Sequence, residues 1–436
     1  MMENTIKSKA IDYNSPDYKR SRNSYVVQCT LEYFVSLLVT DAFLAKVLTE
    51  LGMRDFLIGI ISSFISLSFV FQLFSIIIVK ARISTKKLVI TADTISQIFF
   101  MLIYIIPFLS IGENIKKALV VFSILIAYAI KYLIISLCYK WANSYVDPKK
   151  RATYSANKEI VSLVLGIVFS SVMGAVIDKF EGLGNIKGGF LFIAISMLVL
   201  NICNFISLMM IKKENEEYHK ADNTSFKTVI KNTLFNKDFR NVIIMASMWS
   251  IAQFFSIGFM GVYKTKELMM SVLLVQVINM AANGFRVIIS RSFGRFSDKY
   301  SYAKGMELAL CIAGLGFLLN CFTTPKYWFF IVLHTILFNC AMAGINGNSF
   351  NIVYSYVSIE YMSQAMALKN SISGICGFAA AFLGGKVLDC IQKNSNTVFG
   401  IHLYGQQVLS LISLVFTIAT LLFIHFVIAK QKVKIQ

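Results

Sequence analysis

The sequence is poor in charged residues. Only 15% of its 436 residues are Asp, Glu, Lys or Arg, whereas soluble globular proteins carry about 25%. Hydrophobic residues make up 56%, and they gather in long runs. A run of about 20 apolar residues is enough to cross a bilayer as an α-helix. The scarcity of charge therefore excludes an ordinary soluble domain and predicts an integral membrane protein.

Acidic residues are scarcer than basic ones. The chain has 23 Asp and Glu against 42 Lys and Arg, a formal net charge of +19. In a soluble protein this excess would suggest a nucleic-acid partner. Here the cations lie mostly in short connections and tails, so anionic lipid headgroups are the simpler partner. We expect no nucleic acid to bind.

Motifs of catalytic and metal sites are missing. None of the eight cysteines forms a C-x-x-C pair, and all lie in or next to apolar runs, as small buried hydrophobes do. The four histidines are scattered, and neither H-E-x-x-H nor a Walker sequence is present. We predict no enzymatic activity, no metal and no cofactor.

Twelve apolar segments are long enough to span a membrane. Their approximate cores are 26–48, 56–79, 88–109, 117–138, 159–178, 188–211, 241–262, 268–290, 305–324, 327–355, 368–390 and 404–429. Alternate connections are rich in Lys and Arg, which places them and both termini in the cytoplasm. The predicted divisions are a cytoplasmic tail, a six-helix bundle, a charged cytoplasmic linker, a second six-helix bundle and a short tail, at 1–24, 25–211, 212–240, 241–430 and 431–436.

The two predicted bundles are internal repeats. Tyr145-Val146 recurs as Tyr356-Val357, and four further residues of the fifth segment recur in the eleventh at the same offset of 211 positions. These pairs are Lys158 and Lys369, Gly166 and Gly377, Gly174 and Gly385, and Asp178 and Asp389. An even number of helices in each repeat gives both bundles the same orientation in the membrane. The fold class we predict is all-α, with twelve helices in two pseudo-symmetric bundles.

A short basic stretch joins the eighth and ninth segments. It reads Gly294-Arg-Phe-Ser-Asp298-Lys299-Tyr-Ser-Tyr-Ala-Lys304. This stretch resembles the cytoplasmic loop signature of the major facilitator superfamily, with Gly294, Asp298 and Lys299 in register. Ser301 replaces a second glycine, and Lys304 alone represents the basic end. The glycine would allow two helix ends to approach closely, and the carboxylate could cap a neighbouring helix.

The resemblance implies a secondary transporter with a central polar cavity between two bundles. Residues 146–151, Val-Asp-Pro-Lys-Lys-Arg, also resemble the acidic–proline–basic start of the family's fifth helix, and Arg151 would act in a cytoplasmic gate. Two features depart from the family. The connection at 79–87 lacks glycine and aspartate, and the fifth segment lacks the proline usual in drug–proton antiporters.

Charged residues inside the predicted helices are candidate functional groups, because a charge in a bilayer is costly. Asp41 is our candidate for proton or cation coupling; the alternative is a partner for a buried lysine. Lys131 needs a counter-ion, and Asp93 and Asp41 are the options. Lys131 could also bind an anionic group of a substrate. Glu32, nine residues before Asp41, would lie on the opposite helix face and reach toward the headgroups.

Neutral polar residues suggest a substrate path. They comprise Trp249 and Gln253 in the seventh segment, Gln276, Asn279 and Asn283 in the eighth, and Asn339 and Asn346 in the tenth. The spacing in the eighth segment places three amides on one helix face. Such amides bind polar solutes, but they also join helices to one another.

We therefore predict a transporter that moves a small solute by alternating access, coupled to a proton or cation gradient. It would lie in the cell membrane as a monomer. Two alternatives remain at this stage. One is a sensor or scaffold of the same fold that transports nothing, and the other is a membrane-embedded enzyme.

Overall fold

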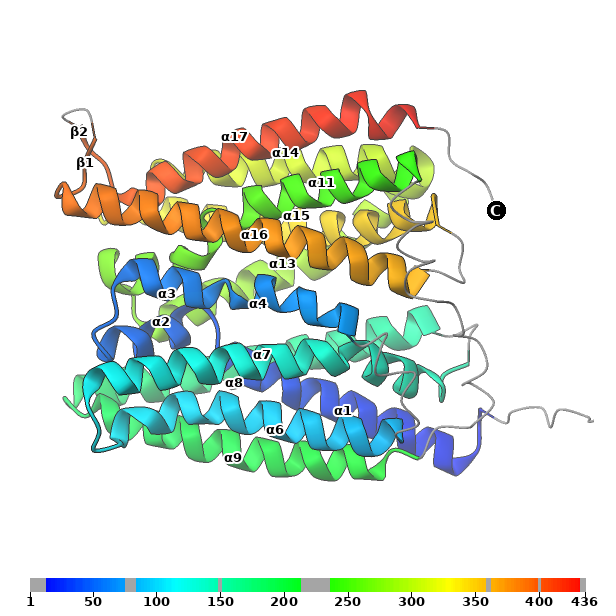
Figure 1. Cartoon of the computed structure of the whole chain (residues 1–436), viewed down its shortest axis with the longest axis horizontal. Coiled ribbons are helices and arrows are strands. Elements are labelled where there is room, and N and C mark those ends of the chain that lie inside the picture. Colours follow the sequence, from blue (N-terminus) through cyan, green and yellow to red (C-terminus); the bar gives the residue numbers. More distant parts are fainter. Residues whose placement is uncertain are drawn as a thin grey trace, which may run out of the picture.

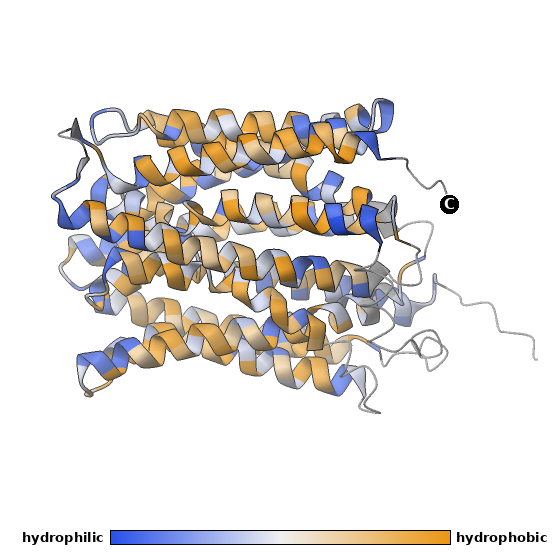
Figure 2. Ribbon diagram, turned by 45° about the horizontal axis from the view of Figure 1, so that its top comes forward, coloured by the Kyte–Doolittle hydropathy of each residue, from blue (hydrophilic) through white to orange (hydrophobic). Residues whose placement is uncertain are grey.

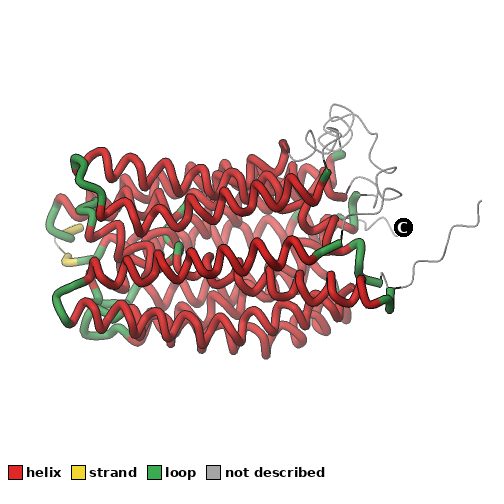
Figure 3. The backbone as a smooth tube through the Cα atoms, turned by 90° about the horizontal axis from the view of Figure 1, so that it is seen from below, coloured by secondary structure: helices red, strands yellow, loops and turns green. Residues whose placement is uncertain are grey.

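The molecule is a bundle of long helices. The computed structural model describes residues 13–74, 84–147, 151–212, 236–357, 362–398 and 401–431. Figure 3 shows the helices running side by side along one direction, with loops at the two ends. Apolar residues cover the middle of the helices and polar residues their ends (Figure 2). The predicted linker falls largely at 213–235, outside the described residues.

The first half of the chain supplies the helices that Figure 1 shows in blue to green. They are α1 (Pro16–Leu38), α2 (Asp41–Glu50), α3 (Asp55–Ser62), α4 (Phe64–Ser68), α6 (Thr85–Ile105), α7 (Glu113–Asn143), α8 (Arg151–Gly182) and α9 (Ile186–Met210). Short 3₁₀ turns, η1 (Phe69–Phe71) and η2 (Ile106–Phe108), follow α4 and α6. We call this set the N-terminal half.

The second half supplies the helices coloured green to red. They are α11 (Lys237–Phe254), α12 (Met260–Val262), α13 (Val272–Lys299), α14 (Tyr302–Asn320), α15 (Phe329–Tyr354), α16 (Met362–Lys393) and α17 (Gly405–Phe426). Short turns η5 (Ile257–Phe259), η6 (Tyr263–Glu267) and η8 (Ile428–Lys430) extend them, and a small hairpin pairs β1 (Thr397–Val398) with β2 (Ile401–His402). We call this set the C-terminal half.

The prediction of an all-helical membrane protein is confirmed. Among the described residues, eleven helical stretches are long and apolar enough to span a bilayer. The first of the twelve predicted segments, 26–48, is not one of the eleven, because it is divided into α1 and α2. The break falls at Val39 and Thr40, where Thr40 has an extended backbone conformation.

Several polar contacts between the halves lie at one end of the bundle. This far end holds the β-hairpin, whereas α1 begins and η8 ends at the opposite end (Figure 1). At the far end, the Asp178 carboxylate of α8 accepts hydrogen bonds from the backbone N–H groups of Val272 and Leu273, at 2.9 and 2.8 Å. An acid at this position neutralises the positive end of the α13 dipole.

A second contact of this kind lies nearby. Asp55, the first residue of α3, is buried and pairs with Lys266 at 2.7 Å. Its other oxygen accepts a hydrogen bond from Gln392 of α16, also at 2.7 Å. Asp55 therefore joins the N-terminal half to two segments of the C-terminal half.

Glycines of the two repeats permit close helix packing across the halves. A methyl group at Gly174 would lie 3.0 Å from the Leu273 Cα of α13, and one at Gly385 would lie 2.7 Å from the ring of Phe56 in α3. The fifth and eleventh helices of the two repeats thus use matching glycines against the opposite half. Asp178 and Asp389 differ in contacts, since Asp389 pairs with Lys393 within α16.

The stretch 294–304 differs from its prediction. Gly294, Asp298 and Lys299 belong to the last turns of α13, so the connection to α14 is only Tyr300 and Ser301. A methyl group at Gly294 would meet nothing within 4 Å, which contradicts the expected close approach. Close approach occurs instead at Gly305 of α14, where a methyl group would lie 2.0 Å from the Ser297 oxygen.

The capping role expected of Asp298 is also wrong. Ser301 caps α14, since its side chain accepts a hydrogen bond from the N–H of Lys304. The Asp298 side chain is exposed and makes no hydrogen bond or ion pair with the residues that the structure describes. The ring of Tyr300 lies between the ammonium groups of Lys299 and Lys304, at 5.2 and 5.8 Å.

Replacing Gly374 by alanine tests the packing between the halves. The new methyl group would lie 2.3 Å from the carbonyl oxygen of Ser66, so α16 and α4 must separate. We expect G374A to lower the free energy of unfolding by about 1–3 kcal/mol in thermal unfolding of the purified protein. Gly347 of α15 has nothing within 4 Å, so G347A is the matched control and should not destabilise. Equal stability of the two variants would contradict this account of the interface.

Candidate functional site

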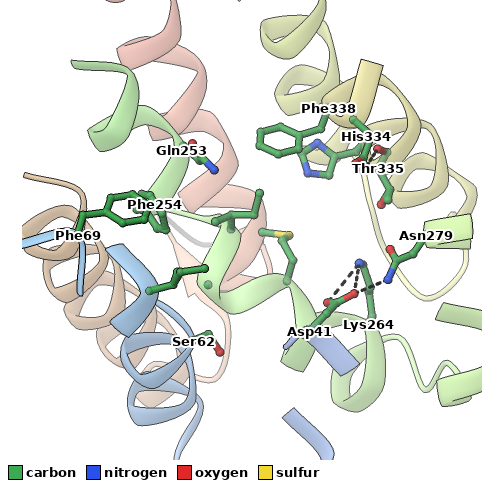
Figure 4. Close-up of a pocket in the computed structure, with 16 residues that line it drawn as sticks. Asp41, Ser62, Phe69, Gln253, Phe254, Lys264, Asn279, His334, Thr335 and Phe338 are labelled. Carbon is green, nitrogen blue, oxygen red and sulfur yellow. Dashed lines mark hydrogen bonds and ion pairs between the residues drawn. The ribbon is translucent and has the colours of Figure 1, made fainter. Parts of the chain in front are cut away.

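A cavity of about 420 Å³ lies between the two halves. The N-terminal half contributes few residues to its wall, among them Asp41, Ser62 and Phe69, whereas α11 to α15 supply most of it. Figure 4 shows Asp41, Lys264 and Asn279 together on one side, with Gln253 and Phe254 on another and His334, Thr335 and Phe338 above. The wall therefore joins one charged cluster to aromatic and amide surfaces.

Asp41 and Lys264 form an ion pair across the halves. The Lys264 Nζ lies 3.1 Å from one carboxylate oxygen of Asp41 and 3.4 Å from the other. The amide nitrogen of Asn279 donates a hydrogen bond to the same carboxylate at 2.8 Å. The Lys264 side chain is only 6% exposed and that of Asp41 25%. Asp41 thus neutralises a buried lysine, and three helices meet at its carboxylate.

The break between α1 and α2 places the Asp41 side chain here. Thr40 turns its hydroxyl back onto the Ser36 carbonyl at 2.8 Å, and the carbonyl of Leu38 accepts a hydrogen bond from the Tyr104 hydroxyl. At a helix break, backbone carbonyls lose their partners within the helix. Here side-chain hydroxyl groups donate to two of these carbonyls. Asp41 itself has a φ of 47°, a left-handed conformation that Asp tolerates better than most residues.

The seventh membrane helix is also irregular at this point. Residues 263–267 form a π-helical turn, a feature often found at functional sites. It turns Lys264 inward, although the sequence places this residue beyond the end of an apolar run. A methyl group at Gly261 would lie 2.7 Å from the carbonyl oxygen of Asp41, so this glycine permits the contact between the two irregular segments.

His334 contributes a buried ring to the cavity wall. The residue is 4% exposed, and its Nδ1 faces α14, where a methyl group at Gly316 would lie 3.5 Å from it. Its ring lies between those of Phe317 and Phe338, with centroid distances of 5.5 and 5.8 Å. The sequence prediction missed Lys264 as a cavity residue, because the sequence places it in a connection beyond the end of an apolar run.

The structure brings only part of the predicted path together. Gln253, Asn279 and Asn339 line the cavity with Asp41. The other predicted path residues are not among its lining residues: Trp249, Gln276, Asn283 and Asn346. Trp249 stacks on Phe338, with ring centroids 6.3 Å apart, so it supports the wall from behind. Gln276 is buried, at 3% exposure.

The predicted counter-ion of Lys131 is wrong. Lys131 of α7 pairs with Glu32 of α1 at 3.0 Å, and neither Asp93 nor Asp41 is its ion-pair partner. Glu32 also accepts a hydrogen bond from Gln28 at 3.2 Å, so it faces the bundle interior and does not reach for the headgroups. The prediction that Glu32 and Asp41 lie on opposite faces assumed one continuous helix. The helix is broken at Val39 and Thr40, so this assumption does not hold.

Asp93 and Arg151 lie away from the cavity. Asp93 is 3% exposed and accepts a hydrogen bond from Asn204 of α9. Arg151 begins α8, and its side chain is outside what the structure describes. Within the described part of the chain, no group of three or more His, Cys, Asp and Glu residues has the geometry to hold a metal ion.

Comparison with known proteins places the fold. A family model described as Major Facilitator Superfamily matches residues 29–381. A search of curated proteins finds no significant match. The similar solved structures include the nucleoside transporter NupG, at 16% identity with a TM-score of 0.69, covering 96% of this chain and 100% of that one.

Two further structures have the same fold. An auto-inhibited peptide transporter of the POT family is 9% identical with a TM-score of 0.71, covering 96% of this chain and 98% of that one. A bacterial homologue of the iron transporter ferroportin is 13% identical with a TM-score of 0.55, covering 92% and 98%. At these identities the likeness concerns the fold alone.

A double-mutant cycle tests the Asp41–Lys264 pair. Asn at position 41 tolerates the left-handed backbone, so D41N removes the charge and keeps the shape. We expect D41N and K264M each to lower the free energy of unfolding by about 3 kcal/mol, because each leaves a buried group unpaired. The double variant should recover most of this loss in the same thermal assay.

The exposed pair of Asp17 and Lys212, at 3.1 Å, provides the control. D17N should change stability by less than about 1 kcal/mol, because water screens an exposed ion pair. Strictly additive effects of D41N and K264M would show that the two residues do not interact.

Proposed function

We propose that this chain, which belongs to the Major Facilitator Superfamily, moves a small amphipathic solute through the cavity that contains Asp41 and Lys264. The fold of the family implies secondary transport. The observation that carries the proposal is a cavity whose wall comes from both halves, as alternating access requires. A solute bound there contacts both bundles, so it can influence which end of the cavity is open.

The chemistry of the wall favours a planar or cyclic solute with several hydrogen-bonding groups. Phe69, Phe254 and Phe338 offer aromatic surfaces, and Gln253 and Asn339 offer amides. Nucleosides combine these properties, and a nucleoside transporter shares the fold, so nucleosides are the first class to test.

We further propose that the Asp41–Lys264 pair couples solute movement to a proton or cation. Neutralising the Asp41 carboxylate would leave Lys264 without its counter-ion and weaken a contact between the halves. A solute group that binds Lys264 would then compete with Asp41 for the same ammonium. Binding of either the coupling ion or the solute would thus change the contact between the two halves.

Sidedness follows from the charge pattern of the connections. We propose that both termini are cytoplasmic, as the Lys- and Arg-rich connections indicate, in a cell membrane with anionic lipids. The far end, where Asp178 and Asp55 join the halves, would then face outward. With that orientation the structure corresponds to a state closed on the outer side. Transport as a monomer is part of the proposal.

A ligand screen followed by flux tests the transporter proposal. Thermal shifts of the purified protein would be measured with nucleosides, sugars, amino acids, short peptides and lipophilic cations at two pH values. A ligand at one hundred times its Kd stabilises by about 2.7 kcal/mol. We expect a hit that also accumulates in proteoliposomes, with D41N losing the response to a pH gradient. A ligand that binds without flux would favour the sensor or scaffold alternative.

Two asparagines of α15 separate binding from helix packing. Asn339 lines the cavity, whereas Asn346, on the same helix, is exposed and outside it. We expect N339A to raise the KM of transport about tenfold, the equivalent of one lost hydrogen bond, and N346A to leave KM unchanged. Equal effects of the two substitutions in the flux assay would remove this cavity as the binding site.

A further inference from the structure

A second polar cluster lies inside the N-terminal half, away from the cavity. Asp93 and Gln97 lie one turn apart on α6, and Asn201 and Asn204 lie on α9. The two helices pack against each other, and all four residues are 2–6% exposed. Four polar side chains are thus buried together between helices of a single half.

Several oxygen atoms of these side chains lack a hydrogen-bond donor. The Asn204 amide nitrogen donates to the Asp93 carboxylate. The Gln97 amide also interacts with the Asp93 carboxylate. The side-chain oxygens of Gln97, Asn201 and Asn204 have no hydrogen-bond partner among the described residues. Buried polar groups are normally paired, so unpaired oxygens beside a carboxylate indicate that something else binds them.

The charge of the region is also unbalanced. The charges of Glu32 and Lys131 act on Asp93, and these two residues already form an ion pair at 3.0 Å. With both acids ionised, the group of Glu32, Lys131 and Asp93 has a net charge of −1. An uncompensated charge inside a membrane-spanning bundle is strongly unfavourable. The nearest further cation is Lys158, whose ammonium lies over the rings of Tyr25 and Tyr139 at 4.9 and 5.7 Å. It forms no ion pair with Asp93 among the described residues, so a positive charge in contact with Asp93 is missing.

We propose that this cluster binds a monovalent cation, sodium, through the Asp93 carboxylate and the side-chain oxygens of Gln97, Asn201 and Asn204. Hard cations select oxygen ligands, and one net negative charge matches one monovalent ion. A proton on Asp93 would balance the charge and its O–H could donate to one amide oxygen, but the other two amide oxygens would stay unpaired. Calcium or magnesium would require more carboxylates, and softer metals would require His or Cys ligands.

The site has a consequence for transport. The ion would hold α6 and α9 together by ligands from both helices, next to the pair that joins α1 and α7. A coupling role for sodium rests on the proposed transport function, whereas binding itself does not. The test therefore measures binding directly on the full chain, so failure of transport and failure of this site are distinguishable.

Binding of ²²Na⁺ to the purified full-length protein tests the site, together with thermal unfolding in NaCl, KCl and choline chloride at equal ionic strength. We expect about one sodium ion per chain and a melting temperature several degrees higher in NaCl than in choline chloride. No bound sodium, or a stability that follows pH and ignores sodium, would overturn the proposal, and the latter result would assign the site to a proton.

Variants locate the ion. D93N removes the carboxylate charge, and Q97M removes one oxygen ligand at constant charge and similar shape. We expect D93N to abolish sodium binding and Q97M to weaken it about tenfold. D298N neutralises an exposed carboxylate in the C-terminal half and should bind sodium as the wild type does. If D93N fails to fold, Q97M decides the question. Wild-type sodium affinity in Q97M, or in a folded D93N, would contradict the assignment.

Discussion

The ion pair of Asp41 and Lys264 is the contact on which the central cavity depends. Each charge is placed by an irregular backbone segment, the break before α2 and the π-helical turn at residues 263–267. Regular helices would direct these side chains elsewhere, and either charge alone would be costly in this surrounding. The two irregularities therefore require each other, and Gly261 permits them to touch.

Two further contacts between the halves, at the far end, follow a common design. Buried or partly buried acids of one half meet donors of the other: Asp178 meets the start of α13, and Asp55 meets Lys266 and Gln392. Glycines beside them allow the helices to approach. Interactions of this kind are directional and few, so a small number of broken contacts can separate the halves at this end.

Inside the N-terminal half, buried charges also require partners, but only some of them have one. Glu32 and Lys131 form an ion pair, while Asp93 accepts a hydrogen bond from an amide and has no ion pair among the described residues. One half of the molecule thus contains a compensated pair beside an uncompensated acid. The central cavity, by contrast, contains the balanced pair of Asp41 and Lys264. The two sites therefore differ in whether the acid has a cationic partner: Asp41 has one and Asp93 does not.

The sequence by itself determined the membrane-spanning helical fold and the repeat, because both depend on hydrophobic length and on residue spacing along the chain. It also identified Asp41, Asn279 and Asn339 as polar groups within apolar segments. Only the tertiary structure decided the partners, since Glu32 and Lys131 are 99 residues apart in the chain. It also decided that Gly305, and not Gly294, packs closely. Pairing depends on helix rotation and on local breaks, and neither changes the hydrophobic pattern from which the helices are predicted.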